Sequence, residues 1–212
     1  MSPIGNVLIC LMAPLIIAAF CAERRRRRSL IFLMTGMICS LLSSYICGFL
    51  TGILHTDQLT ATLEITPVIE EIMKLCPVLF YLTVFEPKRK NAAGAMLMTS
   101  VGFATFENVC YLITNGASHT LHLLIRGFGA GAMHVVCGAA MGAGMLMFWD
   151  RLSLRVAGTV ALLCVAITYH AVYNVLVSHA GLSAVIGYLI PVLTILIVGG
   201  LGRQRLTELL RE

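Results

Sequence analysis

Charged residues are scarce in this sequence. Only 12% of its 212 residues are charged and 58% are hydrophobic, whereas roughly 25% of an ordinary soluble domain is charged. A chain with so few charges cannot present a normal water-facing surface. The composition therefore excludes a soluble globular protein and predicts an all-α, polytopic transmembrane helical bundle. At about 20 apolar residues per crossing, this length holds at most about eight spans.

Two further absences narrow the class of protein. No pair of the eight cysteines has the spacing of metal ligands, and each stands alone in an apolar stretch, where a thiol behaves as a small apolar side chain. The net charge of +5 does not indicate a nucleic-acid partner. Its basic residues form short clusters between apolar runs, and no basic face is interleaved with aromatics. The lipid bilayer is the expected partner of such a surface.

Seven apolar runs separated by polar linkers predict about seven membrane spans. They cover residues 4–21, 30–54, 61–85, 92–113, 121–149, 156–177 and 182–201. Every second linker is basic, and the positive-inside rule therefore places the N-terminus outside and the C-terminus in the cytoplasm. The first run has no basic residue before it and is expected to be a retained anchor. We expect a single transmembrane domain over residues 1–212, with a catalytic core at about 61–178.

Several polar residues fall well inside four consecutive predicted spans. An intramembrane charge costs roughly 2.5 to 3.5 kcal/mol, so such groups normally face the bundle interior, pair with one another and mark a functional site. Counting from the outer ends at about 1.5 Å per residue puts the main groups roughly 10 to 20 Å below the outer surface. The residues are Glu70, Glu71, Lys74, Glu107, Asn108, Arg126, His134, His170 and Asn174.

Spacing suggests roles for the supporting residues. Lys74 lies one turn from Glu71 and is expected to pair with one carboxylate, leaving the other for chemistry. Arg126 either snorkels to the membrane interface or contacts a carboxylate in the site. Asn108 is expected to form a hydrogen bond between helices. The neighbouring glycines either let helices approach closely or leave room for water or a substrate strand; they are Gly102, Gly127, Gly129, Gly131 and Gly138.

Four intramembrane motifs follow one another between Glu70 and Asn174, a stretch of about half the chain. They are Glu70-Glu71-Ile72-Met73-Lys74, Gly102-Phe103-Ala104-Thr105-Phe106-Glu107-Asn108, His134-Val135-Val136-Cys137-Gly138 and His170-Ala171-Val172-Tyr173-Asn174. This set resembles the PrsW family of bacterial intramembrane proteases, which is similar to the group of CAAX prenyl endopeptidases. The resemblance implies a multi-pass protein of the bacterial cytoplasmic membrane. Its implied activity is cleavage of a single-span membrane protein, such as an anti-sigma factor that controls a stress response, near the extracytoplasmic side.

Two mechanisms fit this residue set. In the first, Glu107, His134 and His170 bind a zinc ion and Glu70 or Glu71 is the general base. In the second there is no metal, because Glu70 activates water directly and His170 with Asn174 forms the oxyanion hole. Similarity to the CAAX endopeptidases favours the second mechanism. A carboxylate at position 107, where that group carries a histidine, favours a cation.

Two other functions use intramembrane polar residues. A proton-coupled transporter or channel also needs buried Glu, His and Lys side chains, but transporters often show two related halves with interrupted helices. Here the polar motifs form one block on consecutive spans. A non-catalytic receptor or scaffold with an inactive site is disfavoured, because the residues needed for catalysis are all present: Glu70, Glu107, His134 and His170. An intramembrane endopeptidase is therefore the function that the sequence favours.

Overall fold

Helices form the fold throughout the computed structural model, which describes residues 3–85, 87–116, 120–149 and 152–209. No strand occurs in these ranges. Arg151 and residues 210–212, which belong to two predicted basic linkers, lie outside them. The elements are α1 (Pro3–Cys21), α2 (Arg24–Leu54), α3 (Gln58–Thr60), η1 (Ala61–Ile65), α4 (Thr66–Phe85), α5 (Arg89–Asn115), α6 (Thr120–Phe148), α7 (Leu152–Ser178) and α8 (Leu182–Leu209). The all-α prediction is confirmed, and a long helix stands at each predicted span.

Six of the described helices are long and apolar enough to cross a membrane, judged by length and composition. The remaining long helix, α4, carries Glu70, Glu71 and Lys74 within its 20 residues. All three of these residues are buried against other helices. Their charges therefore face the protein interior, and α4 takes the place of the third predicted span.

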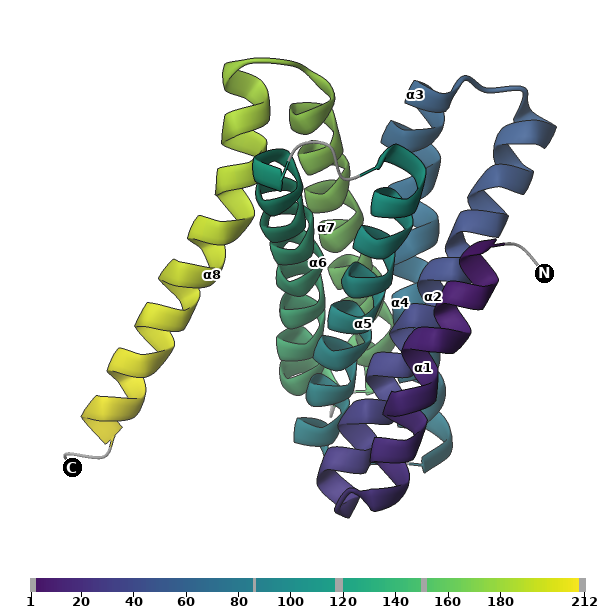
Figure 1. The fold of residues 1–212 in the computed structure, drawn as a ribbon. Helices are drawn as coiled ribbons and strands as arrows, with labels where there is room; N and C mark the ends of the chain where they lie inside the picture. Colours follow the sequence, from purple (N-terminus) through teal and green to yellow (C-terminus); the bar gives the residue numbers. More distant parts are fainter. Residues whose placement is uncertain (1–2, 86, 117–119, 150–151, 210–212) are drawn as a thin grey trace.

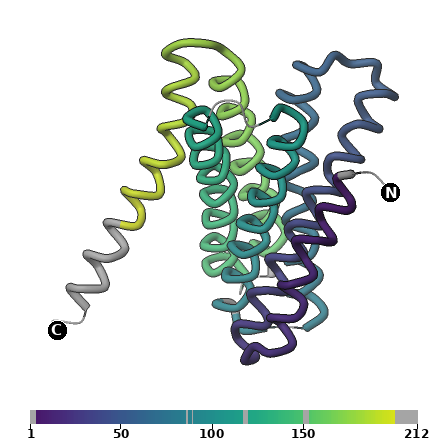
Figure 2. The backbone as a smooth tube through the Cα atoms, viewed as in Figure 1, coloured from purple at the N-terminus to yellow at the C-terminus, as the bar shows by residue number. Residues whose placement is uncertain are grey.

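The helices run up and down in one bundle. Helix α4 packs against α2, α5 and α7, and α6 packs against α5, α7 and α8. Helix α1 lies along α2, while α8 leaves α6 and α7 at an angle and leans away from the bundle (Figure 1). Figure 2 shows α3, the end of α5 and the α7–α8 turn at one end of the bundle. We call this the α3 end; the opposite end, where α2 begins, is the basic end.

Glycines bring α2 and α5 into backbone contact. A side-chain carbon at Gly36 would collide with the backbone of Thr99 and Phe103, and one at Gly102 would collide with the carbonyl of Leu33. Small residues commonly allow such close approach between membrane helices. This contact fixes α5, and with it Glu107, relative to α2.

A π-helical turn interrupts the segment that leads into α4. Asp57 caps its start by accepting hydrogen bonds from the backbone of Leu59 and Thr60, and these bonds, that from Thr60 above all, lower the pKa of Asp57. In η1 the Thr66 N–H bonds to the carbonyl of Ala61, five residues back. Pro67 follows directly and cannot donate to a helical carbonyl. Single π turns of this kind often occur at functional sites.

Candidate active site

Helix α4 brings an ion pair into the centre of the bundle. Lys74 and Glu71 have fully buried side chains, and the Lys74 Nζ lies 2.6 Å from Glu71 Oε1. The same ammonium donates to His134 Nδ1 at 3.0 Å and lies 5.2 Å from the centre of the Phe103 ring. The predicted pairing of Lys74 with one carboxylate is thus present, and the carboxylate is Glu71.

Glu71 also orients His170 from α7. Its Oε1 accepts a hydrogen bond from His170 Nδ1 at 2.8 Å. A neutral imidazole that donates through Nδ1 carries its free lone pair on Nε2. Carboxylates hold metal-binding histidines in this way in many metalloenzymes.

Glu70 faces two histidines. Its Oε2 lies 3.9 Å from His134 Nε2 and 3.9 Å from His170 Nε2. The two imidazole rings meet edge to face with centroids 5.1 Å apart. Glu70 Oε2 is buried and has no hydrogen-bond partner among the described residues. A buried carboxylate oxygen without a partner is expensive, which makes this point of the site a candidate for a bound cation.

Glu107 occupies the other side of His134. Its Oε2 is hydrogen-bonded to His134 Nε2, and its Oε1 lies 3.0 Å from the Arg126 guanidinium. Because Lys74 occupies Nδ1 as a donor, His134 carries its hydrogen on Nε2 and donates it to Glu107. The side chain of Glu107 is 27% exposed, which is more than the side chains of Arg126, His134 and Lys74.

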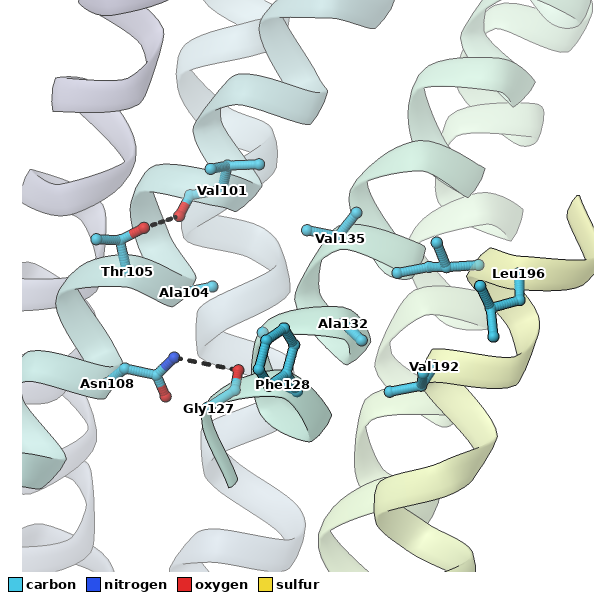
Figure 3. A pocket seen from close by; sticks show the side chains of 12 residues that line it. Val101, Ala104, Thr105, Asn108, Gly127, Phe128, Ala132, Val135, Val192 and Leu196 are labelled. Atoms are coloured by element: carbon cyan, nitrogen blue, oxygen red, sulfur yellow. Dashed lines mark hydrogen bonds between the residues drawn. The ribbon is translucent and has the colours of Figure 1, made fainter. Parts of the chain in front are cut away.

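Arg126 and Asn108 hold Glu107 in place. The guanidinium donates to Asn108 Oδ1 at 2.6 Å and stacks 3.7 Å from the centre of the Tyr111 ring. Of the two interpretations of Arg126, the structure therefore shows contact with a carboxylate. Asn108 in turn donates to the Gly127 carbonyl across the α5–α6 interface (Figure 3), as expected for a helix-to-helix hydrogen bond.

Asn174 binds backbone at the π turn. Its Nδ2 donates to the carbonyl of Thr62 at 2.9 Å. That carbonyl lacks the usual donor, because the Thr66 N–H is diverted to Ala61 and Pro67 has no N–H. Sequence reasoning missed Thr62, although Pro67 five residues later was a signal. The amide of Asn174 keeps a second hydrogen for another acceptor.

The glycines follow both predicted patterns. A side-chain carbon at Gly129 would press against Tyr188 of α8, and one at Gly138 would press against Ser100. Gly127 and Gly131 instead help line an apolar groove of about 400 Å³ between α5, α6 and α8, with Asn108 beside Gly127 (Figure 3). Close approach and open space thus occur on the same helix.

One group of ligand atoms is compact enough for a metal ion. Atoms from Glu70, His134 and His170 all lie within 4.8 Å of one another, and zinc binds such nitrogen and oxygen ligands at about 2.0–2.2 Å. The unpartnered oxygen of Glu70 fits this use. The sequence predicted Glu107 as a ligand beside the two histidines, whereas the structure brings Glu70 to within 3.9 Å of both and holds Glu107 against His134 and Arg126.

Buried glutamate, histidine and lysine from four successive helices, with a group suited to a metal, define a membrane-embedded hydrolase of the metallopeptidase type. The comparison with protein families makes the assignment specific. The model of the "PrsW family intramembrane metalloprotease" matches residues 9–199, and the chain belongs to this family. No curated protein and no solved structure matches it. The predicted family and the predicted class of enzyme, an intramembrane protease, are confirmed.

Proposed function

We propose that this protease cleaves a single-span membrane protein, with an anti-sigma factor as the model substrate, near the extracytoplasmic side of a bacterial cytoplasmic membrane. The observation that carries the proposal is the buried, unpartnered Oε2 of Glu70 between the Nε2 atoms of His134 and His170. The resemblance of the four motifs supports the substrate class. Positive residues at the opposite end of the bundle support placing the α3 end outside.

Glu70, His134 and His170 are the residues that would hold the metal, for which zinc is our candidate. His134 would bind through Nε2 once the hydrogen that it donates to Glu107 has been released, as ligand protons are when a metal binds. Bound there, the ion would polarise the scissile carbonyl and lower the pKa of a coordinated water. Glu71 prepares His170 for this role by accepting the Nδ1 hydrogen. Lys74 balances the charge of Glu71 in a place where no solvent reaches either group.

Glu107 is our candidate for the general base. A base must lie within hydrogen-bond reach of the proton it takes, and Glu107 adjoins the Nε2 of His134 while keeping part of its side chain exposed. It would take a proton from water and pass it to the leaving amine. Arg126, bonded to the other oxygen of Glu107, fixes the orientation of this carboxylate.

Asn174 supports the site from α7. By donating a hydrogen bond to the carbonyl of Thr62, it connects the π turn, and thus the start of α4, to the helix that carries His170. Its second amide hydrogen is available for the predicted contact with the oxyanion of the substrate. We therefore assign it a positioning role, with the oxyanion contact as an additional one.

The test is cleavage of a single-span anti-sigma-type reporter by the purified protein in proteoliposomes. We expect Glu70→Gln to abolish cleavage, whereas Glu64→Gln, at an exposed carboxylate less than two turns away, should retain it. Loss of cleavage on zinc chelation, with recovery on adding zinc, would support the metal mechanism. Loss in Glu70→Gln without sensitivity to the chelator would favour metal-free activation of water by Glu70. Equal cleavage by Glu70→Gln and the unaltered protein would overturn the proposal.

A further inference from the structure

A polar cavity leads from the α3 end of the bundle to Glu70. It has a volume of about 510 Å³ and lies between α2 and the continuous α3–η1–α4 segment. Among the described lining residues, Gln58 lies at the end of the bundle and Glu70 lies in its interior. We call this space the hydroxyl cavity, because four of its lining residues carry hydroxyl groups: Ser44, Thr51, Thr62 and Thr66.

The hydroxyl groups leave hydrogen-bond acceptors available along the cavity. Thr51 donates its hydroxyl hydrogen to Cys47, Thr62 donates to Gln58, and Ser44 donates to Ser40, in each case to a backbone carbonyl of the same helical segment. A hydroxyl oxygen that has donated its hydrogen still has lone pairs for an incoming donor. Water is retained where a site is roomy and offers several polar partners, and this cavity meets both conditions.

The apolar groove beside α8 differs in its chemistry. Residues such as Val101, Phe128 and Leu196 line it (Figure 3), and Glu70 is not among its described lining residues. A groove of this composition does not stabilise a file of water molecules. Among the described cavities, the hydroxyl cavity therefore combines polar walls with contact to the metal-site carboxylate.

We propose that the hydroxyl cavity is the path by which the hydrolytic water reaches Glu70, an inference that rests on the proposed protease function. Each turnover adds one water across the peptide bond: the hydroxyl joins the acyl carbon, the carbon–nitrogen bond breaks, and a proton ends on the amine. The hydrocarbon region supplies no water. An enzyme buried among helices must therefore carry its own polar path.

Two glycines on α2 give a matched test of this path. Gly48 lines the hydroxyl cavity and Gly52, one turn further, is outside its described lining. A side-chain carbon at either position would meet nothing within 4 Å, so neither substitution forces a clash at its first carbon. We expect Gly48→Leu to lower the cleavage rate constant at least tenfold by filling the cavity, and Gly52→Leu to leave it within twofold. Thermal unfolding of both variants tests whether they are equally stable.

A native cysteine reports on the water without relying on protease activity. Cys47 belongs to the cavity lining and lies roughly 10 Å from the end of α2, at about 1.5 Å per residue. Cys164 is an exposed thiol in the middle of α7, and the middle of a bilayer supplies no water to a thiol outside a polar cavity. Variants that keep only one of these two cysteines, in open membrane fragments, are treated with a charged methanethiosulfonate. We expect Cys47 to react at least tenfold faster than Cys164, and the Gly48→Leu change to suppress its reaction.

The two measurements separate the possible failures. If Cys47 reacts but the protein cleaves no reporter, the water path stands and the proposed protease substrate fails. If the protein cleaves its reporter while Cys47 reacts no faster than Cys164, the hydroxyl cavity is not the water path. Equal cleavage by Gly48→Leu and Gly52→Leu would likewise overturn the inference.

Discussion

Each end of the bundle contains a polar cavity, but the side chains that line the two cavities differ in charge. At the α3 end, the hydroxyl cavity has neutral walls and reaches the carboxylate of Glu70. At the basic end, a cavity of about 890 Å³ is lined by five cationic residues, and none of its described lining residues is acidic. These cations are Arg24, Arg25, Arg28, Lys88 and Lys90.

The difference indicates that the α3 end serves the reaction, whereas the basic end determines how the chain is oriented in the membrane. Charges that stay near a membrane surface keep their hydration and set the topology of the chain. Charges in the interior need partners within the protein. Glu71 pairs with Lys74 and Glu107 pairs with Arg126, whereas the Oε2 of Glu70 lies 3.9 Å from two histidines and has no hydrogen-bond partner among the described residues. We therefore expect substitutions at the interior site to change activity or folding strongly, and substitutions at the basic end to change neither.

The largest effect is expected from removing the two histidines. His134→Ala together with His170→Ala takes away two of the three proposed ligands, so the purified protein should lose its bound zinc and its cleavage rate should fall at least about a thousandfold. Metal analysis and reporter cleavage measure the two losses. His179→Ala is the matched control, because His179 is exposed and bonds only within its own turn among the described contacts. Zinc retained in the double variant would exclude these ligands.

Loss of Lys74 should destabilise the fold itself. Lys74→Met leaves the buried carboxylate of Glu71 without its ammonium partner, and breaking a buried ion pair on one side typically costs about 3–5 kcal/mol. The measurement is reversible unfolding in detergent, with Lys88→Met, at an exposed lysine of the basic end, as control. Adding Glu71→Gln to Lys74→Met should restore part of the loss. Equal stability of the Lys74 and Lys88 variants would show that the pair is not a structural element.

A smaller loss of stability is expected where α2 and α5 touch. Gly102→Ala adds a carbon that collides with the backbone of Leu33, and overpacking of this kind typically costs about 1–3 kcal/mol. Gly94→Ala, on the same helix, adds its carbon to open space and should be neutral or slightly stabilising. Unfolding in detergent measures both variants. The contact is not required if the two variants are equally stable.

The smallest effect on cleavage is expected at the basic end. Lys88→Gln with Lys90→Gln removes two cations from the basic cavity but touches no residue of the site. Cleavage by correctly oriented protein should stay within twofold. Reporter tags at both termini measure whether the N-terminus is outside in both proteins, as the positive-inside rule predicts for the unaltered chain. A tenfold loss of cleavage with unchanged orientation would show that the basic end contributes to the reaction, contrary to this account.

The number of long helices could be predicted from sequence, and so could the gathering of charged side chains inside the bundle, because such side chains are costly in lipid. Pairings were harder to predict. Glu70, Glu71 and Glu107 are chemically equivalent in a sequence, and only packing shows that Lys74 takes Glu71 while Arg126 takes Glu107.

The partner of Asn174 also lay beyond sequence reasoning. Spacing placed Asn174 on the face of His170, which is correct for a helix, but its acceptor is a carbonyl more than a hundred residues earlier in the chain. That carbonyl is free only because a π turn precedes Pro67. A local irregularity of the backbone thus determined a tertiary hydrogen bond.

The most direct test of the central claim is hydrolysis of the single-span reporter in ¹⁸O-labelled water, with the products analysed by mass spectrometry. Our account predicts a single cut in the part of the reporter span nearest the α3 end, with one ¹⁸O in the new carboxyl group, and no product from Glu70→Gln. A labelled product formed equally by Glu70→Gln, or no cleavage of any reporter by the unaltered protein, would contradict it.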